Sequence, residues 1–201
     1  MNETYRSLFI LIKSALTGEK AALPDNADWP MLIRIAYTHN IVPLLFYGLK
    51  VCDIETPYNE NLFVFTGKNI IVEQQQFEAL SQITKTFSKA KIDHAFLKGI
   101  KTKTIYPKSE MRIMSDLDIL IKEAQYGQIK PLMKEMGFKK TFQDDNVFVW
   151  ERGPVVVELH ITFVSQAKKD LYEYFGECWS QFSPSKESPY CYELKIGRAH
   201  V

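Results

Sequence analysis

Apolar residues recur at helical spacing throughout residues 1–90 of the chain. A spacing of three or four residues places apolar side chains on one face of a helix, and an Asp before an early Pro is a typical helix start. Such signals occur at Leu8-Ile12-Leu16, Asp28-Trp29-Pro30, Pro43 and the stretch 59–90. The helix after Asp28 is expected to end near His39-Asn40. The pattern therefore predicts an N-terminal helical region.

The pattern changes near Lys91, where short apolar runs bounded by turn residues begin. Such runs favour strands, and the turn Gly153-Pro154 predicts a hairpin. Strands are expected over 93–97, 116–121, 138–142, 146–152 and 155–162, and helices over 100–106, 122–136 and 170–179. Gly137 is expected at the C-terminal end of the second of these helices. The order predicts an α+β fold, a mixed β-sheet core flanked by helices over residues 91–195.

Composition narrows the class of protein. The 201 residues are 46% hydrophobic and 13% aromatic, which excludes a disordered chain. The net charge of +1 gives no overall field for binding nucleic acid. Three widely spaced cysteines argue against a zinc site and a disulfide framework, so we expect a reducing, cytoplasmic location. Since no run of about 18 uncharged apolar residues occurs, we expect no membrane span.

The last six residues, 196–201, are identical to the translation of a widely used DNA-sequencing adapter in one reading frame. We therefore interpret them as a non-native tail and expect the native chain to continue beyond Lys195.

Candidate chemistry begins with acidic residues on two expected strands. Residues two apart on a strand point to the same face, so Asp116 and Asp118 are expected to project together. Paired carboxylates suit Mg²⁺ or Mn²⁺. Glu158 is the acid within the run 155–160, and His160 shares its face. If this strand lies beside the first, three carboxylates converge on one cation site.

A glycine turn precedes these acids in the chain. Gly99 follows an expected strand and opens a short helix, an arrangement that lets backbone N–H groups approach a phosphate. Lys98 and Lys101 add positive charge there, and Arg112 could pair with a phosphate or with one of the acids. A phosphate cradle beside a carboxylate-held metal is what phosphoryl or nucleotidyl transfer requires.

These motifs resemble the uncharacterised nucleotidyltransferase family of the polymerase-β-like superfamily. The resemblance covers residues 28–162. It rests on Trp29–Leu49, Leu97-Lys98-Gly99, Tyr106-Pro107, Arg112, Ser115-Asp116-Leu117-Asp118-Ile119-Leu120, Met136-Gly137-Phe138 and Glu158-Leu159-His160. A nucleotidyltransferase-like core is therefore expected, although Lys98-Gly99-Ile100 stands where the superfamily commonly has Gly-Ser.

The resemblance also implies roles for individual residues. It implies that Asp116 and Asp118 bind the metal, and that Glu158 is the third carboxylate and the candidate base. It implies that Gly99 lies at the nucleotide-phosphate loop. We expect Lys98, Lys101, Arg112 and Ser115 to complete the nucleotide site, with His160 in a supporting position.

The leading hypothesis is a metal-dependent enzyme that moves a nucleoside monophosphate from an NTP to an acceptor hydroxyl. The acceptor could be a small molecule, a protein side chain or an RNA end. The alternative is a catalytically inactive relative that binds a nucleotide or a partner protein, for example in a toxin–antitoxin or biosynthetic pair. A hydrolase that uses the same acids with water as acceptor also remains open.

Overall fold

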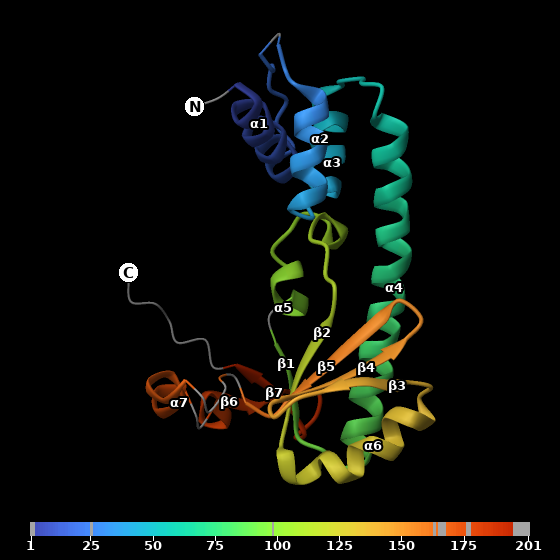
Figure 1. Cartoon of the computed structure of the whole chain (residues 1–201), viewed down its shortest axis with the longest axis vertical. Coiled ribbons are helices and arrows are strands. Elements are labelled where there is room, and N and C mark those ends of the chain that lie inside the picture. Colours follow the sequence, from blue (N-terminus) through green and yellow to red (C-terminus); the bar gives the residue numbers. More distant parts are fainter. Residues whose placement is uncertain are drawn as a thin grey trace. The chain divides into compact units, whose positions relative to one another are not determined.

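The structure, a computed structural model, describes residues 3–24, 26–97, 99–162, 164, 168–175 and 178–194 (Figure 1). The chain divides into two compact units. One consists of residues 1–74 and 102–114, and the other of residues 75–101 and 115–201. This division does not coincide with the change of sequence pattern near Lys91, because the long helix α4 (Asn59–Lys89) contributes residues to both units.

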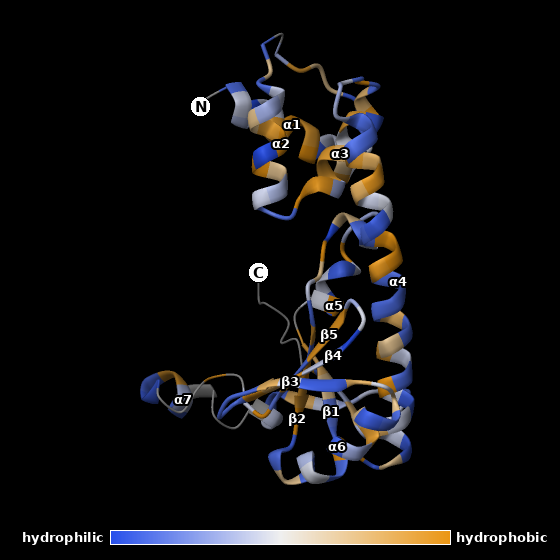
Figure 2. Ribbon diagram, turned by 45° about the vertical axis from the view of Figure 1, so that its right-hand side comes forward, coloured by the Kyte–Doolittle hydropathy of each residue, from blue (hydrophilic) through white to orange (hydrophobic). Residues whose placement is uncertain are grey.

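The first unit is helical, as the N-terminal pattern predicts. It contains the first half of α4 together with α1 (Glu3–Thr17), α2 (Trp29–Thr38) and α3 (Val42–Cys52). The Asp28 side chain caps α2 by accepting a hydrogen bond of 3.0 Å from the backbone N–H of Met31. The apolar faces of these helices meet in a core that includes Leu11, Leu32 and Leu45, all fully buried (Figure 2).

The chain returns to the first unit at residues 102–114. This segment contains one 3₁₀ turn, η1 (Ser109–Met111). Met111 is buried in a small apolar cluster with Ala15 of α1 and Leu44 of α3. Met111 therefore anchors this segment to the helical core.

The second unit is built on a mixed seven-stranded sheet with the order β3-β4-β5-β2-β1-β7-β6. Neighbouring strands are antiparallel except for the pairs β2–β5 and β1–β7, which are parallel. The strands are β1 (His94–Phe96), β2 (Leu117–Ile121), β3 (Lys139–Gln143), β4 (Val147–Arg152), β5 (Val155–His160), β6 (Phe182–Pro184) and β7 (Cys191–Leu194). The hairpin predicted at Gly153-Pro154 joins β4 to β5 and is confirmed.

Helices α4 and α6 (Tyr126–Glu135) pack on one face of this sheet. The ring of Phe87 in α4 lies 5.5 Å from that of His94, the register partner of Ile121. Tyr126 of α6 stacks on Phe148 of β4 at 3.5 Å. Since side chains alternate along a strand, Asp118 of β2 points to the other face.

Several expected element boundaries are corrected by the structure. Asp116 precedes β2 instead of lying in it, and all five positions of β2 are buried instead of alternating. The helix expected over 100–106 is α5 (Gly99–Lys103), and the one expected over 170–179 is α7 (Lys169–Phe175). Strands β6 and β7 were not expected from the sequence.

Two findings in the described residues concern membrane spans and cysteines. No helix in these parts of the chain is both long and apolar enough to cross a membrane. Cys52 and Cys191 are free thiols.

Candidate active site

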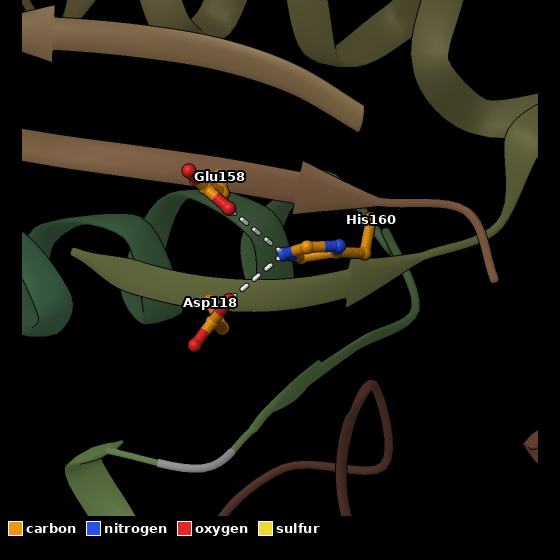
Figure 3. A group of neighbouring side chains, drawn as sticks. All are labelled: Asp118, Glu158 and His160. Carbon is orange, nitrogen blue, oxygen red and sulfur yellow. Dashed lines mark hydrogen bonds and ion pairs between the residues drawn. The ribbon is translucent and has the colours of Figure 1, made fainter. Parts of the chain in front are cut away.

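The central feature of the site is the pairing of β2 with β5. The two strands run parallel, and Asp118 is the register partner of Glu158. Both side chains lie on the sheet face opposite α4 and α6 (Figure 3). The expected acid cluster requires the strand of Asp118 to lie beside the strand of Glu158, and the structure has these two strands paired.

His160, two residues after Glu158 on β5, completes the group. Its Nε2 lies 2.8 Å from Oδ1 of Asp118 and 3.4 Å from Oε2 of Glu158. One possible ligand atom from each of the three residues lies within 4.8 Å of the others. The side chains of Asp118 and His160 are 8% and 14% exposed, whereas that of Glu158 is 30% exposed, so Glu158 is the member most open to an incoming molecule.

Asp116 is not part of this close group. It lies two residues before Asp118, just outside β2, and is half-buried. Ser115 beside it is exposed. Among the residues that the structure describes, the acidic pair of the motif is therefore split, with Asp118 in the close group and Asp116 at the entrance of the strand.

The expected phosphate-binding residues lie at the start of α5, immediately after β1. Gly99 is the first residue of α5, and Lys98 lies outside the described residues. Lys101 forms an exposed ion pair of 3.0 Å with Glu193 of β7. A phosphate bound by Lys101 would therefore compete with Glu193.

Arg112 belongs to the first unit, where it follows η1. Its carbonyl oxygen accepts a hydrogen bond of 2.5 Å from Nζ of Lys103. Its own Nε is buried and has no hydrogen-bond partner in the described parts of the chain. One donor of the guanidinium is thus unused within the described parts of the chain.

Sequence reasoning assigned His160 only a supporting position, and the structure places its Nε2 in contact with both carboxylates. The signal was the spacing of Glu158 and His160, which share a strand face. A second polar contact, between Glu73 and Lys103, gave no sequence signal because the two residues are 30 positions apart.

The chain was compared with family models, curated proteins and solved structures. Residues 25–194 match the family described as "Uncharacterised nucleotidyltransferase". No curated protein matches the chain. Among solved structures, the solution structure of the antibiotic-resistance factor ANT(2″)-Ia matches with 14% identity and a TM-score of 0.39, over 44% of this chain.

That match spans 48% of the resistance factor, so the chain corresponds to about half of its length. The family match extends from before α2 to the end of β7 and includes Asp116, Asp118, Glu158 and His160. Because it covers most of the chain, the protein belongs to the uncharacterised nucleotidyltransferase family.

Proposed function

We propose that the protein is a metal-dependent nucleotidyltransferase that moves a nucleoside monophosphate from an NTP to an acceptor hydroxyl and releases pyrophosphate. The observation that carries this proposal is the convergence of Asp118, Glu158 and His160 on neighbouring parallel strands, in a chain of a nucleotidyltransferase family. The acceptor is a small molecule, a protein side chain or an RNA end.

The side chains present fit a hard divalent cation. Carboxylate oxygens are the ligands that Mg²⁺ and Mn²⁺ prefer, and Asp118 and Glu158 supply them from adjacent strands. We assign Asp116 as a further carboxylate near the entrance of β2. Imidazole suits Mg²⁺ poorly, so the 2.8 Å contact of His160 with Asp118 favours a role in orienting that carboxylate.

A bound divalent cation supplies charge neutralisation at the α-phosphate and at the leaving pyrophosphate. In the proposed reaction, the acceptor oxygen attacks the α-phosphorus, and the bond from that phosphorus to the oxygen bridging it to the β-phosphate breaks. Glu158 takes the proton of the acceptor hydroxyl, a role that its partial exposure allows. His160 holds Asp118 in place during the reaction.

The triphosphate is assigned to Lys98, Gly99, Lys101, Ser115 and Arg112. Gly99 offers backbone that can approach a phosphate closely, and the lysines and Arg112 offer positive charge. We place the reaction in the cytoplasm, in keeping with the free thiols of Cys52 and Cys191.

Thermal unfolding with Mg²⁺ or Mn²⁺, with and without each NTP, tests the binding part of this proposal. A ligand that binds only the folded state, present at about 100 times its dissociation constant, stabilises it by about 2.7 kcal/mol. We expect this shift to need metal and NTP together. Absence of any shift would favour the inactive relative that binds a partner protein.

Incubation with labelled NTPs, Mg²⁺ and cell extract tests the transfer. We expect label on an acceptor together with release of pyrophosphate. Release of pyrophosphate together with free NMP, without any added acceptor, would instead identify a hydrolase.

A further inference from the structure

A buried ion pair joins α4 to α5 within the first unit. Nζ of Lys103 lies 2.7 Å from Oε1 of Glu73, and the two side chains are 3% and 9% exposed. Lysine is among the residues least often buried, and a buried lysine ammonium needs a partner. This ion pair therefore differs from an ion pair between exposed side chains, because both of its charges are removed from water.

The Lys103 ammonium has three N–H donors and three acceptors. Besides Glu73, it donates to the carbonyl oxygen of Ser109 at 3.2 Å and to that of Arg112 at 2.5 Å. Its hydrogen-bonding capacity is thereby fully used. Lys103 thus connects α4 to both ends of the segment 109–112.

The same segment is held by two further contacts. Met111 is buried in the apolar cluster with Ala15 and Leu44. Oε1 of Glu110 accepts a hydrogen bond of 2.6 Å from the hydroxyl of Tyr47. Neither of these contacts is made to Arg112. The hydrogen bond from Lys103 is made to the backbone carbonyl oxygen of Arg112 itself.

The value of the buried pair lies in geometry more than in stability. Removing two charges from water costs about as much as their mutual attraction returns, so apolar residues of similar volume often serve stability equally well. Apolar side chains could not donate to two carbonyl oxygens. The contacts of Lys103 therefore fix the backbone position from which the Arg112 side chain extends. The Nε of Arg112 is buried and has no hydrogen-bond partner among the described residues.

We propose that Glu73 and Lys103 are positioning residues that fix the backbone of Ser109–Arg112 and thereby prepare Arg112 to bind the triphosphate. This inference rests on the proposed function, because it uses the assigned role of Arg112. Neither residue touches the nucleotide. Lys103 acts through the Arg112 carbonyl, and Glu73 acts by compensating the charge of Lys103.

The double variant Glu73→Met/Lys103→Met removes both charges together and leaves no unpaired buried ion. We expect the KM for NTP to rise between about 10-fold and 100-fold, since a misplacement of about 1 Å can cost that much. Binding of Mn²⁺ in the absence of NTP should remain at the wild-type level. Tyr47→Phe is the matched control, because it removes a hydrogen bond to Glu110 and leaves the Arg112 carbonyl held.

A double-mutant cycle with Arg112→Met separates positioning from general damage. If Lys103 acts through Arg112, the Met/Met change should raise KM little further once Arg112 is already Met. Additive effects, or an unchanged KM in the Met/Met variant, would overturn the inference. Should the Met/Met variant fail to unfold cooperatively, the Glu73→Gln/Lys103→Gln variant is subject to the same two criteria.

Amide hydrogen exchange provides a readout that needs no turnover. The Met/Met variant should exchange faster than wild type over residues 104–114, with unchanged exchange in α1 and α2. Unchanged exchange over 104–114 would refute the positioning role whatever the activity. If exchange over 104–114 is faster in the variant but the wild-type protein neither binds nor turns over any NTP, the role of Glu73 and Lys103 in fixing this segment is upheld. The proposed function is then refuted instead.

Discussion

Asp118 and His160 face each other across the parallel strands β2 and β5, with His160 Nε2 2.8 Å from Oδ1 of Asp118. The register partner of Asp118 is Glu158, and His160, which holds Asp118, follows Glu158 by two residues on β5. This contact holds the buried Asp118 carboxylate in one orientation, as its proposed role as a metal ligand requires.

Asp118→Asn tests the central ligand. The amide has the size of the carboxylate and its oxygen can still accept from His160, but it lacks the negative charge. We expect turnover to fall by at least about 100-fold, because a metal ligand supports several kcal/mol of transition-state stabilisation. Steady-state kinetics and Mn²⁺ titration measure the loss, and the unfolding midpoint should stay near that of wild type. Near-normal turnover would remove Asp118 from the proposed site.

Asp116→Asn tests whether the carboxylate at the entrance of β2 takes part. If Asp116 approaches the cation when NTP binds, turnover should fall about as far as in Asp118→Asn, by at least about 100-fold. Asp145→Asn, at an exposed acid in the turn between β3 and β4, is the matched control and should leave turnover unchanged. Equal activity of the two variants would show that Asp116 is not required.

Glu158→Gln separates the proposed base from a metal ligand. Loss of a general base costs between about 100-fold and 10,000-fold in kcat. We expect a loss near the lower end, with Mn²⁺ affinity kept within about tenfold, because the other acids still bind. Glu151→Gln changes an exposed acid on the neighbouring strand β4 and should have no effect. If Mn²⁺ binding disappears in Glu158→Gln, Glu158 is primarily a ligand.

Local signals in the sequence predicted much of this architecture. Asp28 before Trp29-Pro30 identified the start of α2, and Gly153-Pro154 identified the hairpin, because caps and turns depend on neighbouring residues. The convergence of Asp118 and Glu158 was expected only if their two strands were neighbours, and it is the structure that pairs them. What the sequence could not supply is set by contacts between distant residues. Strand β7 exists because it pairs with β1, and Lys103 is buried because it meets Glu73.

We expect His94 to make the stability of the fold depend on pH. It is fully buried, one ring nitrogen bonds the carbonyl oxygen of Ile92 at 2.9 Å, and the other has no partner in the described structure. Burial lowers the pKa of His94 below the ordinary 6.5. Below pH 6.5 the unfolded chain therefore binds a proton that the folded chain binds less readily, so stability falls as the pH drops.

We expect urea unfolding to show this loss between pH 7.5 and pH 5, with a slope of up to about 1.4 kcal/mol per pH unit. In His94→Asn, whose amide can still donate to Ile92, the slope in this range should decrease. His39→Gln changes an exposed histidine and should leave it as in wild type. An equal slope in wild type and His94→Asn would exclude His94 as its source.

Two helical glycines should respond to alanine in opposite directions. A Cβ atom at Gly48 of α3 would overlap the carbonyl oxygen of Leu11 in α1, so the glycine permits the close approach of these helices. Overpacking of this kind costs about 1–3 kcal/mol, and we expect Gly48→Ala to lower the free energy of unfolding by that amount.

At Gly67 of α4 nothing lies within 4 Å of the added atom. Gly67→Ala should therefore raise the free energy of unfolding by about 0.5–1 kcal/mol through helix propensity. Chemical denaturation of the two variants measures both, and a stabilised Gly48→Ala protein would show that α1 and α3 do not pack as closely as described.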